Sequence, residues 1–180
     1  MGARRPQIDA AIGFHHDQVG VAVPEHLIQQ GRRNLVFLGA RMHQDRRAKQ
    51  RCDGFLQAAH AAGAVAKVAE HPDTASAEIG SMLLAEALRL HPDTDGIACS
   101  NDHIALGALF ACERRKIAVP DRLAVVGFGD LSFSAACNPP LTTIRPSGDL
   151  IGREAARLIE DHLNGEKPTE SRMIDTRFTL

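Results

Sequence analysis

The pattern of apolar and polar positions divides the chain into alternating strands and helices. Short continuous apolar runs predict strands buried on both faces, and longer stretches with apolar residues three and four apart predict amphipathic helices. Strands are predicted at Leu35–Leu38, Val65–Ala69, Gly96–Ser100 and Leu123–Phe128. Helices are predicted at Gln18–Gln30, Asp45–Ala62 and Ser76–Leu90, and a fourth, capped by Asn101 or Asp102, runs to Arg115.

This order of elements predicts an α/β fold. Strands that alternate with helices are connected by right-handed crossovers, which build a parallel sheet with helices on both faces. The alternation of strands and long helices stops at Asn138-Pro139-Pro140, because proline interrupts regular structure. Beyond it we predict a short strand at Leu141–Ile144, a helix from Ser147 to about Asn164, and a last strand near Met173 to Phe178.

Composition and charge restrict the class of protein. The 180 residues are 44% hydrophobic and 24% charged with a net charge of -1, which is typical of a soluble globular domain. A module that binds nucleic acid usually carries a strong excess of Lys and Arg, which this chain lacks. No apolar stretch approaches the roughly 18 residues that a membrane-spanning helix needs, so no membrane contact is expected.

The cysteines and the first residues indicate a cytoplasmic protein. The cysteines show no C-x-x-C spacing, so they predict reduced thiols rather than a zinc or redox site. They are Cys52, Cys99, Cys112 and Cys137. The Arg4-Arg5 pair is not followed by the apolar run of a signal peptide, so export is not expected.

Polar residues follow two of the predicted strands, at the edge where open parallel sheets bind ligands. Asn101 and His103 follow the third strand, where a side-chain amide can cap the next helix and also hydrogen-bond a hydroxyl. Gly129 and Asp130 follow the fourth strand. The glycines of this segment resemble the opening of a dinucleotide-binding loop, but the third glycine is missing, so a tight turn is the favoured interpretation.

A basic run opens the second predicted helix. Arg47 and Arg51 are four residues apart, so they lie on one helix face. Such a run is usually solvated. At a helix N-terminus that faces a cleft it can instead hold an anionic or polyhydroxylated ligand, because arginine suits bidentate contact with a carboxylate.

Motifs of catalysis and metal binding are missing. The chain has no nucleophile elbow, no phosphate-binding loop and no zinc-protease motif, so we do not expect an enzyme. His15-His16-Asp17 is a possible start of a metal site, but further ligands are not identifiable. We therefore expect no metal and no cofactor.

Three ordered segments resemble the LacI/GalR family of transcription regulators. They are Gly96–Leu109, Arg115–Phe128 and Asn138–Ile144, and the likeness extends to Gly31–Ala40, to Gly54-Phe55 and to the end of the chain. The resemblance implies a periplasmic-binding-protein-like fold of type I, in which two α/β lobes enclose an effector. It further implies that a helix-turn-helix headpiece and most of the first lobe lie outside this chain.

The resemblance also implies how the chain divides between the lobes. Residues 1–17 would be a remnant of the first lobe and a crossover, and residues 18–138 the second, C-terminal lobe. Residues 139–166 would cross back and carry a first-lobe helix, and residues 167–180 a strand that returns to the second lobe. The apolar face of that helix, for example Leu150, Leu158 and Leu163, would lack its sheet, so we expect it to pack on another copy or to be displaced.

Residue by residue, the resemblance carries a ligand site over to this chain. Arg51 matches the effector-binding arginine of the family, Asn101 its cleft asparagine and His103 a neighbouring contact position. The family commonly has an aspartate where this chain has Gly129, and the aspartate of this chain, Asp130, follows one residue later. The absence of that carboxylate favours an acidic ligand beside Arg51, so a sugar acid is more attractive than a neutral sugar, and gluconate is the candidate.

The resulting hypothesis is an effector sensor for a DNA-binding regulator. A small sugar or sugar acid would alter operator affinity through a homodimer and its headpieces, and this chain alone would bind operator DNA without specificity and effector below full strength. Two alternatives stay open, a sugar-binding protein of a transport system with the same fold and a small α/β enzyme.

Overall fold

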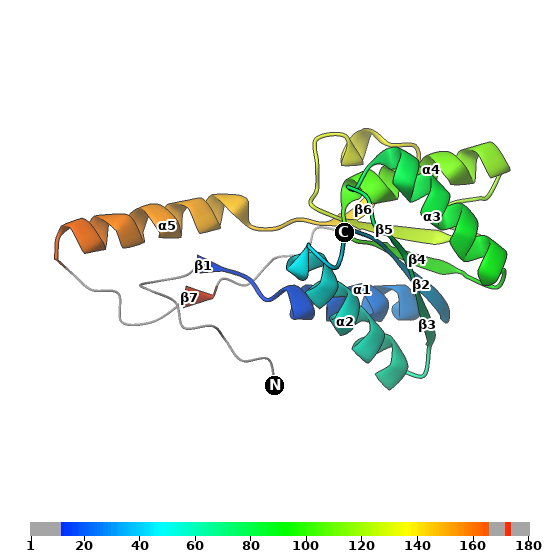
Figure 1. The fold of residues 1–180 in the computed structure, drawn as a ribbon, viewed down its shortest axis with the longest axis horizontal. Coiled ribbons are helices and arrows are strands. Elements are labelled where there is room, and N and C mark those ends of the chain that lie inside the picture. Colours follow the sequence, from blue (N-terminus) through cyan, green and yellow to red (C-terminus); the bar gives the residue numbers. More distant parts are fainter. Residues whose placement is uncertain (1–11, 166–171, 174–180) are drawn as a thin grey trace. The chain divides into compact units, whose positions relative to one another are not determined.

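The structure, a computed structural model, describes residues 12–165 and 172–173 (Figure 1). Its contacts separate two compact units, which we describe one at a time. The larger unit is formed by residues 16–145, and the smaller by residues 12–15, 146–165 and 172–173.

The larger unit is built on a parallel sheet of five strands. The strands are β2 (Asn34–Ala40), β3 (Val65–His71), β4 (Gly96–Cys99), β5 (Ala124–Phe128) and β6 (Thr142–Ile144). They pair in the order β3-β2-β4-β5-β6, and every pair is parallel. The predicted α/β class with a parallel sheet is therefore confirmed.

Two pairs of helices cover the two faces of this sheet (Figure 1). One pair is α1 (His16–Gln29) and α2 (Arg46–Ala61), and the other is α3 (Ala77–Leu90) and α4 (Asp102–Arg115). Side chains alternate along β2, so Val36 and Leu38 join the core under α3 and α4, whereas Phe37 packs on Phe55 of α2 with ring centroids 5.6 Å apart. Burial on both faces explains why this strand has an uninterrupted apolar sequence.

Helix boundaries follow local capping signals. Asp45 caps α2, because its Oδ1 accepts hydrogen bonds from the backbone N–H groups of Arg47 and Ala48, both at 3.0 Å. Helix α1 begins at His16, two residues before the predicted start at Gln18. This difference matters for the site, because it places His16 on the first turn of the helix.

Helices α1 and α2 approach each other unusually closely through two glycines. A Cβ on Gly20 would lie 2.1 Å from the carbonyl oxygen of Arg51, and one on Gly54 would lie 2.2 Å from that of Asp17. Only residues without a side chain permit this distance between backbones. The close approach brings the start of α1 against the middle of α2, where Arg51 lies.

The smaller unit contains a helix and two short strands. Strand β1 (Ile12–Gly13) pairs in parallel with β7 (Arg172–Met173), and α5 spans Gly148–Leu163. On α5, Leu158 is buried whereas Ile159 and Leu163 are exposed. Most of the predicted last strand lies outside the described residues, and the predicted division of the chain into lobes stays a prediction.

Candidate functional site

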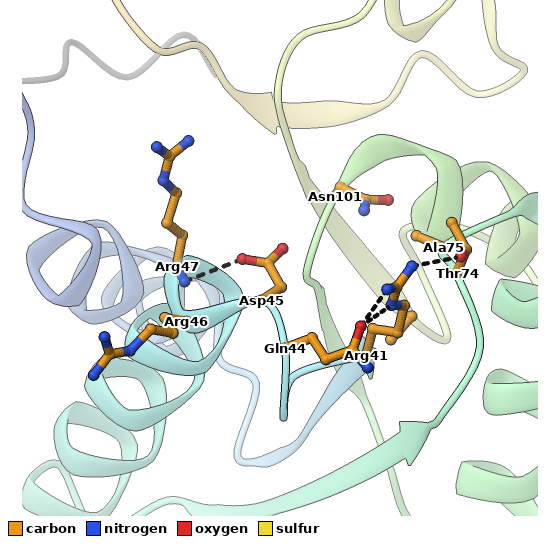
Figure 2. A pocket seen from close by; sticks show the side chains of 9 residues that line it. Arg41, Gln44, Asp45, Arg46, Arg47, Thr74, Ala75 and Asn101 are labelled. Atoms are coloured by element: carbon orange, nitrogen blue, oxygen red, sulfur yellow. Dashed lines mark hydrogen bonds between the residues drawn. The ribbon is translucent and has the colours of Figure 1, made fainter.

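A pocket opens at the carboxyl ends of β2, β3 and β4 in the larger unit (Figure 2). Its volume is about 550 Å³. Its lining residues are Ala40, Arg41, Gln44, Asp45, Arg46, Arg47, Thr74, Ala75 and Asn101. The lining thus contains three arginines and one carboxylate, so its charge favours an anionic ligand.

Arg51 lies in the same part of the sheet, on α2, and is nearly fully buried at 6% exposure. Its Nη2 donates to the carbonyl oxygen of Ser100 at 2.7 Å, and its guanidinium carbon lies 4.0 Å from the ring centroid of Phe128. Burial lowers the pKa of Arg51 to about 10, which leaves the side chain charged at neutral pH. Backbone and ring therefore hold a desolvated cation in a fixed orientation.

This cation lacks a counter-ion within the part of the chain that the structure describes. None of the ion pairs among those residues includes Arg51, and its buried Nε has no hydrogen-bond partner there. Asp45 attracts Arg51 electrostatically, but its Oδ1 is used in capping α2. A buried charge without a paired carboxylate is costly, and an anionic ligand would offset that cost.

His16 completes the surroundings of Arg51. Nη1 of Arg51 lies 2.8 Å from Nδ1 of His16, and the imidazole packs edge-on against Phe128 with centroids 6.0 Å apart. Partial burial, followed by the charges of Arg51 and Arg47, lowers the pKa of His16 to about 4. The imidazole is therefore neutral at neutral pH, and Nδ1 accepts the hydrogen bond from the guanidinium.

Asn101 both caps a helix and lines the pocket. Its Oδ1 accepts from the backbone N–H of Ile104 at 3.1 Å, which begins α4. His103, two residues later, is exposed and packs edge-on against Phe133 with centroids 5.7 Å apart. The capping interpretation of Asn101 is thus confirmed, and the ligand contacts of Asn101 and His103 stay predictions.

The loop after β5 carries the remaining predicted residues. Gly129 has a φ of +131°, a conformation that side chains disfavour, and its N–H donates to the carbonyl oxygen of Ile144 at 2.8 Å. Asp130 accepts a hydrogen bond from Nε of Arg145 in an ion pair. Its carboxylate is therefore already engaged, and Gly129 places no carboxylate beside Phe128.

A buried carboxylate, Asp102, holds this loop in place. Its oxygens accept from Oγ1 of Thr143 at 2.6 Å, from Oγ of Ser134 at 2.8 Å and from the N–H of Leu131 at 2.9 Å. The side chain is fully buried, and its donors come from β6 and the loop after β5. Asp102 thereby joins three segments at the carboxyl edge of the sheet.

The arginines of the predicted basic run differ in their environments. Arg47 is exposed and acts on His16 and Arg51 through its charge, whereas Arg51 is buried. In Figure 2, the side chains of Arg46 and Arg47 lie on one side of Asp45 and Arg41 on the other. Arg41 donates to Gln44 and, from Nη1, to Oγ1 of Thr74 at 3.1 Å.

Sequence reasoning missed three residues of this region. The sequence pattern predicts Phe128 only as part of a buried strand and carries no signal for Arg41. The pattern marks His16 only as the possible start of a metal site.

Among the described residues, no group of three or more His, Cys, Asp or Glu side chains is placed to hold a metal ion. The described helices also include none long and apolar enough to cross a membrane.

Comparison with known proteins shows which family has this architecture. Residues 24–179 match the model of the periplasmic binding protein-like domain. The HTH-type transcriptional regulator GntR of Pseudomonas aeruginosa is 36% identical over 171 residues, which cover 94% of this chain and 49% of the relative. GntR of Escherichia coli K12 is 31% identical over 180 residues, which cover 100% of this chain and 54% of the relative.

A solved structure of a transcription regulator has the same fold. The transcription regulator GntR from Chromobacterium violaceum is 35% identical, with a TM-score of 0.85, and the match covers 96% of this chain and 64% of that one. The chain therefore spans about half the length of the curated relatives it matches. These relatives are transcriptional regulators, not enzymes, which agrees with the lack of catalytic motifs in the sequence.

The sheet, its helix layers and the polar groups at its carboxyl edge define a ligand-binding lobe. The chain belongs to the family of periplasmic binding protein-like domains, in the form that LacI-type transcription regulators use to bind their effectors.

Proposed function

We propose that this chain senses a small sugar acid, of which gluconate is our candidate, for a LacI-type transcription regulator. The observation that carries the proposal is the buried Arg51, which has no paired carboxylate among the described residues. A ligand carboxylate bound there would supply the missing charge and form hydrogen bonds with the guanidinium. The polyol part of the ligand would then extend toward Asn101 and the arginine-lined pocket.

The loop after β5 favours an acid over a neutral sugar. Gly129 contributes no carboxylate, and the carboxylate of Asp130 is paired with Arg145. Without a free carboxylate, this loop does not repel an anion, and it lacks the acceptors that would bind the hydroxyl groups of a neutral sugar. Specificity for acids would therefore come from the lack of a free carboxylate on this loop as well as from the positive charge of Arg51.

Regulation would act through the whole protein, beyond this chain. The relatives are named as HTH-type regulators, and we propose that a helix-turn-helix headpiece outside these residues binds the operator in the cytoplasm. The sugar acid would shift operator affinity by binding one arrangement of the lobes more tightly than the other. We further propose that the regulator acts as a homodimer.

Calorimetric titration tests the ligand proposal. We expect gluconate to bind the chain, whereas glucitol, the neutral polyol with the same carbon skeleton, binds at least tenfold more weakly. Arg51→Met should lose at least tenfold in affinity for gluconate, because one charge-assisted interaction contributes about 1.5–3 kcal/mol. The matched control is Arg89→Met, which removes an exposed arginine from the last turn of α3, outside the pocket lining, and should change affinity less than threefold.

Two results would contradict this proposal. The first is equal binding of gluconate by Arg51→Met and the unchanged chain. The second is tighter binding of glucitol than of gluconate, because a site organised around a buried cation cannot prefer a neutral ligand.

A further inference from the structure

The hydrogen bond between His16 and Arg51 fixes the protonation state of His16. A guanidinium group has only hydrogen donors, so Nδ1 of His16, 2.8 Å from Nη1, must be the acceptor. That requires a neutral imidazole whose single proton is on Nε2. A protonated His16 could not keep this contact.

The charges that face His16 come from both helices of this face of the sheet. Arg51 and Arg47 of α2 disfavour a second proton, whereas Asp45, which caps α2, and Asp17 of α1 favour it. Burial is the largest effect, and together with the arginines it outweighs the two carboxylates. His16 is thus a neutral imidazole beside a buried cation, and an additional negative charge next to it would raise its pKa.

We propose that His16 is a second anion-binding group of the site, which takes up a proton when a ligand carboxylate binds between it and Arg51. The inference rests on the proposed function, because it assigns a role to His16 toward the same sugar acid. Nη1 of Arg51 would exchange its imidazole acceptor for a carboxylate oxygen, and a proton from solvent would bind Nδ1. The imidazolium would then donate to the other carboxylate oxygen.

This exchange keeps both charge and hydrogen bonds balanced. Before binding, Arg51 and His16 together carry one positive charge, and after binding the charges of the ligand carboxylate and of the new proton cancel each other. Without proton uptake, the carboxylate would take the donor of Arg51 and leave Nδ1 of a half-buried imidazole without its acceptor role. His16 would thereby discriminate for anions, since a neutral polyol brings no charge that could stabilise the imidazolium.

Affinity must then depend on pH. When binding takes up one proton, the affinity rises about tenfold for each unit by which the pH falls. This holds between the pKa of His16 in the free protein and the higher pKa of His16 in the complex. The lower limit of that window is about 4, the value for the protein without ligand. We therefore expect the dissociation constant for gluconate to fall as the pH is lowered from 7.5 to 5.5, by up to tenfold per unit once the pH lies below the pKa of His16 in the complex.

Imidazole nitrogen NMR of the 180-residue chain, with gluconate as the probe, tests the proposal directly. The matched variant is His16→Asn, because an asparagine Oδ1 can accept from Arg51 in the place of Nδ1 but cannot be protonated. It also identifies the His16 signals among those of the nine histidines. Without gluconate at pH 6, His16 should be neutral with its proton on Nε2, and saturating gluconate should convert it to imidazolium.

The variant separates the role of His16 from the proposed ligand. His16→Asn should bind gluconate with an affinity that is flat between pH 7.5 and 5.5. If gluconate perturbs the signals around Arg51 while His16 stays neutral, or if the variant keeps the pH dependence of the unchanged chain, the role of His16 is overturned and the proposed function stands. If gluconate perturbs no signal at all, the proposed ligand is wrong, and the role of His16 falls with it.

Discussion

At the scale of single residues, buried polar groups determine the geometry of the site. Asp102 is fully buried and receives three hydrogen bonds, from Thr143, Ser134 and Leu131. Removal of this acceptor would leave buried donors without partners, which costs more than the loss of the hydrogen bonds themselves. The loop that carries Gly129 therefore depends on a residue that does not line the pocket.

Asp102→Ala should lower the free energy of unfolding by about 3 kcal/mol, because a buried backbone N–H and two hydroxyl groups lose their acceptor. Asp102→Asn should cost less, since its amide oxygen still accepts and the Thr143 hydroxyl can turn to accept from the amide. Urea denaturation at pH 7 measures both changes. The control is Asp73→Ala, an exposed aspartate, which should stay within about 0.5 kcal/mol of the unchanged chain. A loss below about 1 kcal/mol for Asp102→Ala would contradict this role.

Residue patterns predicted part of the site and missed the rest for physical reasons. The i,i+4 spacing put Arg47 and Arg51 on one helix face, and the comparison of that face with a known family singled out Arg51. Neither observation showed that Arg51 is buried, because charged residues are rarely buried and no local pattern marks the exceptions. His16 was missed because its partner lies 35 residues further along the chain.

At the scale of elements, the fold was largely predictable because β2, β4 and β5 are buried on both faces. The edge strand β3 differs from the prediction of a strand buried on both faces, because Val65 and Val68 are exposed. Leu35–Leu38 predicted β2, and the apolar run before Gly127 predicted β5. The predicted helices differ from those observed mainly at their ends, where caps decide the boundary. What the pattern did not indicate is the distance between α1 and α2, which depends on glycines that face a neighbouring backbone.

Gly54→Ala tests this helix contact. Alanine is the better helix former by about 1 kcal/mol, but its Cβ would lie 2.2 Å from the carbonyl oxygen of Asp17. The helices must separate, so we expect a net loss of about 2 kcal/mol in the free energy of unfolding, measured by urea denaturation. Gly152→Ala is the control, because its Cβ has no neighbour within 4 Å and no loss is expected. A stabilised Gly54→Ala variant would contradict the close approach.

At the scale of the whole molecule, exposed apolar residues on paired helices offer a surface for a second copy. Met82 of α3 is 51% exposed and Phe110 of α4 is 45% exposed, and the two helices are joined by the hydrogen bond from Arg114 to Ser81. Both side chains lie on the helix pair that covers one face of the sheet, and exposed apolar residues gathered on one face are a feature of protein interfaces. We therefore propose this α3–α4 surface as the contact of the homodimer.

On this proposal, Phe110→Glu should shift the chain from dimer to monomer, because it would place a charge in the proposed contact. Light scattering coupled to gel filtration measures the mass directly. Leu163→Glu, on the exposed side of α5, is the comparison and should leave the mass unchanged. A dimer that survives Phe110→Glu but not Leu163→Glu would instead assign the contact to α5, the alternative that the sequence raised.

The central claim is that Arg51 binds the carboxylate of a sugar acid, and a crystal structure of the chain grown with gluconate tests it most directly. We expect a carboxylate oxygen about 2.7–2.9 Å from Nη1 of Arg51, with His16 moved from its present hydrogen bond to contact the ligand. A structure in which Arg51 still bonds His16 and Ser100 while gluconate binds elsewhere would contradict the claim.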